Sequence, residues 1–205
     1  IGRRHLRNLL TLGEKDILLY RTHHSTMPDD EISQFPVETD FTAALSHMPD
    51  AVIIANPTSE HMNTAHAAAK AGCHLFIEKP LADRMSEDVE KLEEAIRSSG
   101  IKTLVGFQFR FHPVLMRLKT LLTEDNLGRV YSFRVHWGEY LPGWHPWEDY
   151  RISYAARKDL GGGVVNTLCH PIDYVRWLFG EVESLSAVTG HVSDLEIDVE
   201  DLAEI

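Results

Sequence analysis

Short apolar runs alternate with amphipathic segments over the first hundred residues of the chain. The apolar runs are rich in aliphatic and β-branched residues, as the central strands of a parallel sheet are. They predict strands at 16–21, 51–55, 74–77 and 102–106. The segments between them repeat apolar positions at helical spacing, and they predict helices at 3–12, 40–47, 59–71 and 86–99. Strands that alternate with helices indicate right-handed crossovers, so we expect an α/β fold with a doubly wound parallel sheet.

Residues with known end preferences flank three of these helices. Gly13 and Gly72 follow two of them, where glycine readily takes the left-handed conformation that ends a helix. Ser59 and Ser86 stand at two helix starts, where a serine hydroxyl can accept a backbone N–H. These four residues set the predicted boundaries.

The regular alternation stops after Gly106. The segments expected beyond it are a helix at 113–123, a long strand at 129–139, an aromatic loop at 140–154, a glycine-rich turn at 161–163, a helix at 164–179 and strands at 182–191 and 199–205. Helices segregated from a mostly antiparallel sheet describe an α+β arrangement. We therefore divide the chain into domains 1–106 and 107–205.

Both ends of the chain look interrupted. Ile1 precedes a helix without the strand that normally opens such a domain, and residues 199–205 stop inside a predicted strand. We therefore expect the first strand of the first domain, and the C-terminal part of the second, to lie outside this sequence.

Charge and cysteine content narrow the classes of partner. The 205 residues carry a formal net charge of −11, which argues against nucleic acid and anionic membranes as partners. No apolar run approaches the ~20 residues that a membrane span needs. Cys73 and Cys169 are the only cysteines, and two cysteines make no disulfide framework. The simplest expectation is a cytoplasmic protein.

The start of the chain carries two candidate cofactor contacts. A dinucleotide loop has the pattern G-x-G-x-x-G before its first helix, and Gly2 stands where the third glycine would be. The alternative is a chance glycine at a helix start. Arg21 ends the second predicted element, 19 residues after Gly2. An acid there would bind the ribose 2′-hydroxyl, whereas arginine suits a 2′-phosphate or stacks on adenine; the alternative is a solvated arginine in a turn.

Polar residues follow two of the predicted strands directly. Asn56 comes after the AVIIA strand, and the pair Glu78 and Lys79 comes after HLFI. Because ligands bind at the carboxyl ends of parallel strands, we expect Asn56 to contact a ribose and Lys79, held by Glu78, to be the cation beside nicotinamide and substrate. The alternatives are a turn for Asn56 and a surface ion pair of little energetic value for the other two. His61 is expected to be structural.

The second half carries candidate substrate contacts. Trp144, Tyr154 and Arg157 belong to a loop whose aromatic bodies and polar tips suit a sugar-binding cleft. The alternative is a loop that packs its own aromatic rings.

A histidine on the helix after the glycine-rich turn is the candidate base. If 164–179 is one helix, Asn166 and Thr167 lie about one turn before His170 and help bind substrate. A neutral imidazole there can accept a hydroxyl proton as hydride leaves carbon. The alternative is a histidine packed in the helix. The twelve histidines form no ligand set at metal-binding spacing, so no metal is expected.

These stretches together resemble the Gfo/Idh/MocA family of NAD(P)-dependent oxidoreductases. The matching stretches are IGRRHLRNL, DAVIIANPTSEH, HLFIEKPLA, VGFQFRFHP, YLPGWHPWEDYRISYAARKDLGGG and LCHPIDYVRWLFGEV. They cover nearly the whole chain in family order, and EKP followed by GGG and a helical histidine is a specific combination. The WHPWEDY loop looks most like members from surface-polysaccharide and acidic-sugar biosynthesis.

The resemblance implies a Rossmann-type NAD(P)-binding domain over 1–106 and a substrate-binding and dimerisation domain over 107–205. The roles that it implies are phosphate-loop closure by Gly2, cofactor contacts by Asn56 and Glu78, contact with nicotinamide and substrate by Lys79, and catalysis by His170. The expected partners are a sugar-like substrate and a second copy of the chain, paired through the sheet of the second domain.

One departure from the family pattern leaves a second function open. Members often carry an aspartate one helical turn before the catalytic histidine, where this chain has Asn166 or Thr167. Neither can act as a carboxylate toward His170, so the alternative is a catalytically impaired member that senses a dinucleotide or sugar. If the site is a weakened version of the family's, Thr167→Asp is expected to raise activity or to restore it.

Overall fold

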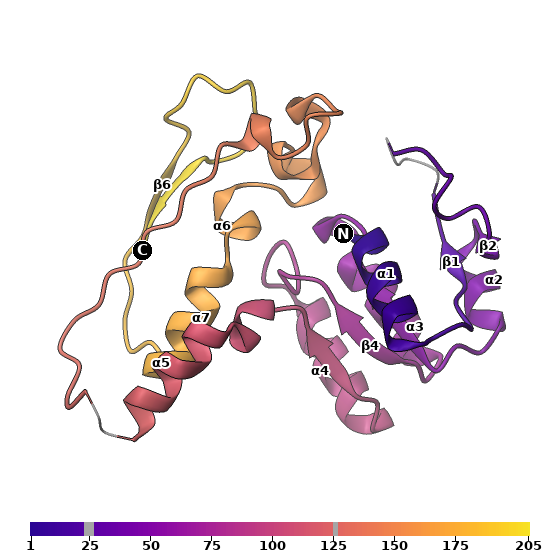
Figure 1. Ribbon diagram of the computed structural model, residues 1–205, viewed down its shortest axis with the longest axis horizontal. Helices are drawn as coiled ribbons and strands as arrows, with labels where there is room; N and C mark the ends of the chain where they lie inside the picture. Colours follow the sequence, from indigo (N-terminus) through magenta and orange to yellow (C-terminus); the bar gives the residue numbers. More distant parts are fainter. Residues whose placement is uncertain (23–26, 125–126) are drawn as a thin grey trace. The chain divides into compact units, whose positions relative to one another are not determined.

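The computed structural model describes residues 1–22, 27–124 and 127–205. The chain divides into two units, Ile1–Leu104 and Val105–Ile205 (Figure 1). The sequence-based boundary between 106 and 107 lies two residues further along the chain.

Parallel strand pairs form the framework of the first unit. Strand β3 (Ala51–Ile54) pairs with β4 (His74–Ile77), with Ala51 opposite His74 and Ile54 opposite Ile77. Strand β5 (Thr103–Val105) is the third member of this sheet, in the order β3-β4-β5. A separate parallel pair joins β1 (Leu19–Tyr20) to β2 (Val37–Glu38). The parallel pairing confirms the α/β prediction, although the strand expected at 16–21 is reduced to two residues.

Helices connect these strands in alternation. The helices of this unit are α1 (Gly2–Leu12), α2 (Phe41–Ser46), η1 (Thr58–Glu60), α3 (His61–Lys70) and α4 (Glu87–Ser99). Gly13 and Gly72 take left-handed φ angles of 92° and 83°, as their places at helix ends require. Ser59 lies inside the 3₁₀ turn η1 and so is not a helix cap, which corrects the prediction. Ser86 does precede α4, but its hydroxyl makes no capping hydrogen bond.

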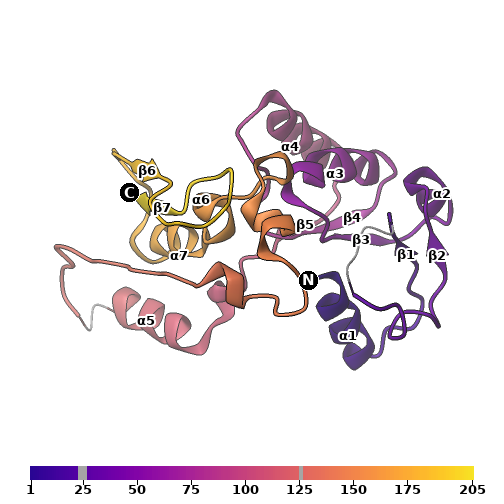
Figure 2. The same cartoon turned by 90° about the horizontal axis from the view of Figure 1, so that it is seen from above.

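The core of the first unit lies on one face of the β3–β4 pair. Leu75 and Ile77 of β4 are at most 3% exposed and pack with Ala65 and Leu92 from α3 and α4. The intervening Phe76 points to the opposite face because successive side chains of a strand alternate, and there its ring meets His5 of α1 at 5.0 Å. Figure 2 shows α3 and α4 on one side of these strands and α1 on the other. This two-sided covering places the ends of β3 and β4 beside the start of α1.

The described residues of the second unit form short helices and an antiparallel strand pair. Its elements are η2 (Gln108–Phe111), α5 (Pro113–Thr123), η3 (Leu141–Gly143), η4 (Tyr150–Ile152), η5 (Tyr154–Ala156), η6 (Lys158–Leu160), α6 (Val164–Thr167), α7 (His170–Phe179), β6 (Val188–Gly190) and β7 (Leu202–Glu204). Strands β6 and β7 pair antiparallel, with Val188 opposite Glu204. This pairing confirms the antiparallel character expected for the second half.

Two predicted elements of the second unit are wrong. Residues 129–139 carry no strand assignment, and Phe133 within them is held by stacking on Phe179 at 4.4 Å. A strand needs a hydrogen-bonded neighbour, and no described strand pairs with residues 129–139. The helix expected at 164–179 breaks between Thr167 and His170. Pro171 explains the break, since its ring would clash with the carbonyl of Thr167 in a continuous helix.

No helix among the described residues is long and apolar enough to cross a membrane.

Candidate functional site

Glu78 lies at the carboxyl end of β4 in a fixed position. Its backbone N–H donates to the carbonyl of Ile54 at 2.9 Å, so the chain stays beside β3 after the strand ends. One carboxylate oxygen lies 2.7 Å from Nε2 of His5, and the other accepts the backbone N–H of Lys79 at 3.2 Å. The side chains of His5 and Glu78 are both less than a fifth exposed. The pair therefore ties the first helix to the EKP segment.

The charge of Glu78 is set by these contacts. Burial by itself raises the pKa of the Glu78 carboxyl, but the hydrogen bond and charge of His5, together with Lys79, outweigh burial and hold the pKa below its ordinary value. The carboxylate is thus ionised at neutral pH and directed by two donors. The carboxyl end of β4 therefore carries the negative charge of Glu78 next to Lys79 in sequence.

Asn56 follows β3 at the same edge. Its amide nitrogen donates to Oγ1 of Thr64 at 2.9 Å. Its amide oxygen is buried and has no hydrogen-bond partner among the described residues. A buried acceptor without a donor is costly, and a ribose hydroxyl is a donor of the right kind. The carboxyl-terminal edge of β3 and β4 therefore has an unsatisfied acceptor that a dinucleotide could satisfy.

His61 is structural, as expected. Its side chain is 1% exposed, and its two ring nitrogens lie 2.9 Å from the carbonyl oxygen of Pro80 and 3.1 Å from that of Asn56. Burial lowers the pKa of His61 despite these two carbonyls, which raise it. The neutral ring donates to one carbonyl at a time and holds the segments after β3 and β4 together.

Gly2 lies at the start of α1 and Arg21 directly after β1, as predicted. The contacts that each residue makes differ from the predicted ones. Gly2 opens α1, and a Cβ added to it would lie 3.9 Å from Cβ of Ala55, an ordinary contact. Close packing therefore does not demand glycine there, and a role in phosphate binding stays a prediction. Arg21 is not a solvated turn residue: its side chain is 15% exposed and pairs with Asp29 at 2.8 Å.

His170 is buried in the second unit and surrounded by aromatic rings. It is 6% exposed, and its ring lies edge-on to Phe109 at 4.8 Å and 6.2 Å from Trp137. The amide nitrogen of Gln108 lies 3.2 Å from Nε2 of His170. With the amide nitrogen as donor, Nε2 of His170 is the acceptor in this contact.

Two residues that the motifs did not reveal bring η2 to α7. Gln108 contacts His170 directly, and the guanidinium of Arg110 makes a two-pronged ion pair with Asp173 at 2.6–3.2 Å. The side chain of Asp173 is 9% exposed and lies one helical turn after His170, so this pair fixes the turn that carries the histidine. The available signal was the alternation of aromatic and polar residues in FQFRF, directly after a predicted strand.

Asn166 and Thr167 do not precede His170 on one helix. Thr167 ends α6, and its hydroxyl donates to the carbonyl of Gly163 at 2.6 Å. The amide of Asn166 donates to the carbonyls of Gly161 and Gly162 at 3.2 and 3.3 Å. Both side chains thus hold the glycine-rich turn, and their role as substrate ligands stays a prediction.

The turn itself requires glycine. A Cβ at Gly162 would lie 2.6 Å from the carbonyl oxygen of Ala155 and 2.8 Å from that of Arg157, both of them backbone atoms. Gly163 has a φ of 96°, and the carboxylate of Glu200 fills the space beside it. The turn is therefore a tight crossing of backbones that positions α6.

Thr167→Asp is expected to destabilise the protein, whereas the sequence alone predicts only that it raises activity. Thr167 is 5% exposed and donates to a carbonyl, so an aspartate would bury a carboxylate against that oxygen. We expect the free energy of unfolding to fall by about 2 kcal/mol or more. Urea denaturation of Thr167→Asp and of Thr167→Ser, which keeps the hydroxyl, measures this. Unchanged stability with faster turnover in the aspartate variant would support the sequence-based expectation instead.

In the aromatic loop at 140–154 and the segment after it, some polar side chains have hydrogen-bond or ion-pair partners and one buried donor does not. Nε1 of Trp144 is buried without a hydrogen-bond partner among the described residues. His145 stacks on Trp147 at 5.0 Å. Arg157 is exposed and pairs with its neighbour Asp159, and Tyr154 opens the turn η5. The substrate contacts predicted for Trp144, Tyr154 and Arg157 remain predictions.

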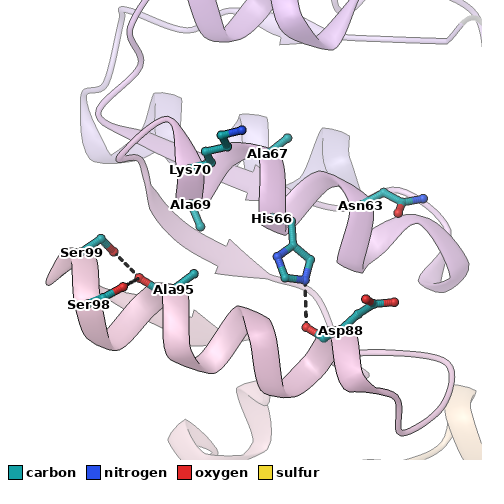
Figure 3. Close-up of a pocket in the computed structure, with 9 residues that line it drawn as sticks. All are labelled: Asn63, His66, Ala67, Ala69, Lys70, Asp88, Ala95, Ser98 and Ser99. Atoms are coloured by element: carbon teal, nitrogen blue, oxygen red, sulfur yellow. Dashed lines mark hydrogen bonds between the residues drawn. The ribbon is translucent and has the colours of Figure 1, made fainter.

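A surface groove between α3 and α4 lies apart from the predicted residues. Its lining includes Asn63, His66, Lys70 and Asp88, and Nε2 of His66 lies 2.8 Å from the carbonyl oxygen of Asp88 (Figure 3). None of the residues predicted to bind cofactor or substrate lines it. Among the residues that the structure describes, no cluster of three or more histidine, cysteine, aspartate or glutamate side chains is arranged to hold a metal.

Family models match both halves of the chain. Residues 1–107 match the oxidoreductase family with an NAD-binding Rossmann fold, and residues 115–205 match the GFO/IDH/MocA C-terminal domain. The chain belongs to the Gfo/Idh/MocA oxidoreductase family. The resemblance seen in its motifs is thereby confirmed.

Individual relatives of this Gfo/Idh/MocA chain include sugar dehydrogenases. Levoglucosan dehydrogenase of Pseudarthrobacter phenanthrenivorans is 35% identical over 67% of the chain and 35% of its own length. D-xylose dehydrogenase of Paenarthrobacter nicotinovorans is 30% identical over 68% of the chain and 36% of its own length. The chain therefore spans about a third of the length of these curated relatives.

A solved family structure has the same fold as the chain. It is the WlbA dehydrogenase from Bordetella pertussis, solved in complex with NADH and UDP-GlcNAcA, with a TM-score of 0.84 and 24% identity. The match covers 99% of this Gfo/Idh/MocA chain and 63% of that one. It supports the α/β and α+β architecture across both units.

Proposed function

We propose that the intact protein is an oxidoreductase that transfers a hydride between NAD or NADP and a hydroxyl-bearing carbon of a sugar or sugar derivative. The observation that carries the proposal is the edge formed by Asn56, Glu78 and Lys79 at the carboxyl ends of β3 and β4. The buried amide oxygen of Asn56 lacks a donor among the described residues, and Glu78 is held ionised beside Lys79. Family membership and the sugar dehydrogenases among the relatives support the same conclusion.

The residues proposed to hold the dinucleotide come from four elements of the first unit, α1, β1, β3 and β4. The N-terminus of α1, which Gly2 opens, offers backbone amides to the pyrophosphate. Asn56 accepts from a ribose hydroxyl through its buried oxygen, and Glu78 lies along the same edge. Arg21, at the end of β1, faces the adenosine ribose. The bound nicotinamide supplies hydride transfer, and the protein supplies its position and the surrounding charge.

Lys79 is proposed to stabilise negative charge on the substrate oxygen. Its backbone N–H donates to Glu78, whose other oxygen contacts His5, so the EKP segment is anchored on both sides. A positioned ammonium group stabilises an alkoxide as it forms, which lowers the barrier to oxidation. Glu78 and His5 are positioning residues in this scheme.

His170 is proposed as the general base that takes the hydroxyl proton. The side-chain amide of Gln108 lies 3.2 Å from Nε2 of His170, where its nitrogen can donate to the ring, and the Arg110–Asp173 pair fixes the helix that carries the histidine. A substrate hydroxyl that replaces the Gln108 amide at Nε2 would deliver its proton there. The sequence has no carboxylate one helical turn before His170. Gln108 and the surrounding aromatic rings orient the imidazole instead.

The substrate is proposed to be a sugar, bound by Trp144, Tyr154, Arg157, Asn166 and Thr167. Aromatic faces pack against sugar rings, and the cation of Arg157 suits an acidic sugar. The WlbA relative in complex with UDP-GlcNAcA supports an acidic or nucleotide-linked sugar. A cytoplasmic location, a homo-oligomer formed through the sheet of the second unit, and no nucleic-acid or membrane partner complete the proposal.

Two measurements on the intact protein test the function. NADH or NADPH should raise the melting temperature, because a ligand that binds only the folded state stabilises it. A panel of neutral and acidic sugars with NAD or NADP should then give a rise in absorbance at 340 nm. Binding of the dinucleotide with no turnover of any sugar would favour a sensor, and the absence of both signals would overturn the proposal.

A further inference from the structure

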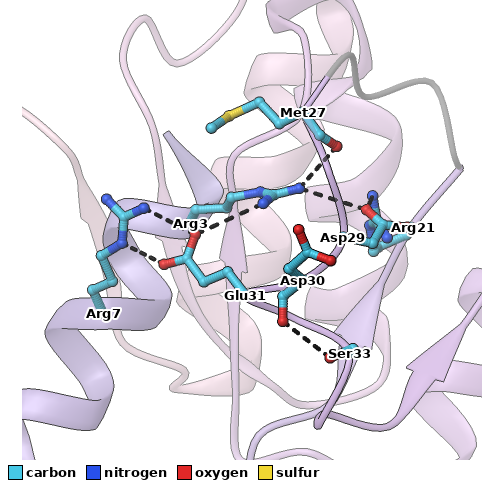
Figure 4. Close-up of polar contacts among 8 residues, drawn as sticks. All are labelled: Arg3, Arg7, Arg21, Met27, Asp29, Asp30, Glu31 and Ser33. Carbon is cyan, nitrogen blue, oxygen red and sulfur yellow. Dashed lines mark hydrogen bonds and ion pairs between the residues drawn. The ribbon is translucent and has the colours of Figure 1, made fainter.

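Two arginines from different elements converge on one carboxylate oxygen in the first unit. Oδ1 of Asp29 lies 2.8 Å from Nη2 of Arg21, at the end of β1, and 3.5 Å from Nη2 of Arg3, in the first turn of α1 (Figure 4). Arg3 also donates to the carbonyl of Met27 at 3.2 Å. A single oxygen therefore faces two guanidinium groups. A phosphate, which presents three oxygens, would satisfy both groups more fully.

The two arginines are the fixed members of this cluster, and Asp29 is the replaceable one. The side chains of Arg3 and Arg21 are 16% and 15% exposed, whereas that of Asp29 is 55% exposed. The backbone of Arg21 donates to the carbonyl of Glu38 at 3.0 Å, which holds it beside β2. The two guanidinium groups are thus mostly buried, and the carboxylate of Asp29 lies on their solvent side.

The turn that carries Asp29 is anchored by an apolar residue. Ile32 is 4% exposed, and its N–H donates to the carbonyl of Asp29 at 3.0 Å. This anchor places the Asp29 carboxylate over the arginines without burying it. The position of the carboxylate is therefore a property of the folded turn.

Of the neighbouring acids, Glu31 contacts Arg3 but is not paired with Arg21 among the described ion pairs. Glu31 pairs mainly with Arg7, and the hydrogen bond from Arg7 holds the pKa of the Glu31 carboxyl below its ordinary value. Its distance to Arg3 is 3.7 Å. Asp30 makes no ion pair in the described part of the chain, and its carbonyl accepts from Ser33. Of the three acids of this turn, Asp29 is the one that bridges Arg3 and Arg21.

We propose that Arg3 and Arg21 form an anion site that Asp29 fills, and that Asp29 thereby sets a preference for a dinucleotide without a 2′-phosphate. The inference rests on the proposed dinucleotide function, because the end of β1 faces the adenosine ribose only if the cofactor binds along this sheet. In the native protein a 2′-phosphate must displace the carboxylate. Removing the charge of Asp29 opens the site to that phosphate.

Binding of two nucleotides that differ by one phosphate tests the inference. The probes are 5′-AMP and 2′,5′-ADP, titrated by calorimetry into the native protein and its variants. In Asp29→Asn, 2′,5′-ADP should bind about 10- to 100-fold more tightly than in the native protein, as expected for charge-assisted hydrogen bonds gained. The affinity for 5′-AMP should stay within about twofold, because it has no 2′-phosphate to contact the arginines.

Two further variants make the result specific. Asp30→Asn removes one charge from the same turn without breaking an ion pair of the described residues, so it should leave the affinity ratio of the two nucleotides unchanged. Adding Arg21→Ala to Asp29→Asn should abolish the gain. Native and variant proteins are compared at equal helix content by circular dichroism.

The possible outcomes distinguish failure of the Asp29 inference from failure of the proposed dinucleotide function. An affinity ratio that Asp29→Asn leaves unchanged while 5′-AMP still binds overturns the inference alone. Native protein that already binds 2′,5′-ADP tenfold more tightly than 5′-AMP also overturns the inference alone. Failure of every variant to bind either nucleotide overturns the dinucleotide proposal as well.

Discussion

Lys79→Ala in the intact protein should lower kcat by at least ~10²-fold, the contribution of a positioned charge to a developing oxyanion. The Kd for NADH should change by only a few-fold, because Gly2, Asn56 and Glu78 are the other proposed cofactor contacts. Stopped-flow kinetics at 340 nm and a fluorescence titration of NADH measure the two quantities.

A second lysine provides the matched control for this result. Lys91 lies on α4, and its exposed ammonium pairs with Glu87 at 3.3 Å. Such pairs contribute little, so Lys91→Ala should leave both kcat and Kd unchanged. Lys79→Arg, which keeps the charge, should retain more activity than Lys79→Ala. Turnover within about threefold of the native rate in Lys79→Ala would remove Lys79 from the mechanism.

His170→Asn should slow alcohol oxidation by about 10²- to 10⁴-fold, the usual contribution of a general base. NAD(P) binding should stay nearly intact, because all the proposed cofactor contacts belong to the first unit. The native rate should rise with pH as the imidazole loses its proton, since only the neutral ring can accept one. The residual rate of the variant should lack this rise.

Gln108 and a surface histidine make the test of His170 specific. Gln108→Leu removes the amide that lies 3.2 Å from Nε2, so it should change the pH profile of the native reaction while retaining a measurable rate. His66→Asn, on the exposed groove of α3, should match the native protein. If His170→Asn keeps both the native rate and its pH dependence, His170 is a packing residue and the sensor function gains support.

Local sequence signals predicted several elements of both units. The strand expected at 74–77 and the helix expected at 113–123 in the second unit have the same bounds in the structure. Apolar alternation, helical spacing and glycine at helix ends act within a few residues, so they can be recognised in the chain itself. The break in the helix before His170 could also have been predicted, because Pro171 comes directly after His170 in the sequence.

The candidate pairs could not be predicted, because they join residues far apart in the chain. His5 contacts Glu78 across 73 positions, and Gln108 contacts His170 across 62. The failed strand at 129–139 has the same origin, since its apolar pattern suits a strand but no described strand pairs with it. Strand pairing and side-chain contact are tertiary properties.

The residue pattern alone was enough to assign the family, the parallel framework and the place of Lys79 at the end of a strand. The tertiary structure decided which charges meet. It showed that Arg21, for which the sequence left a 2′-phosphate contact, adenine stacking and a solvated turn open, is paired with Asp29. It also showed that Thr167 holds the glycine-rich turn. The physical reason is that an ion pair or a buried hydrogen bond depends on distance and burial, and the folded chain sets both through contacts that no local pattern contains.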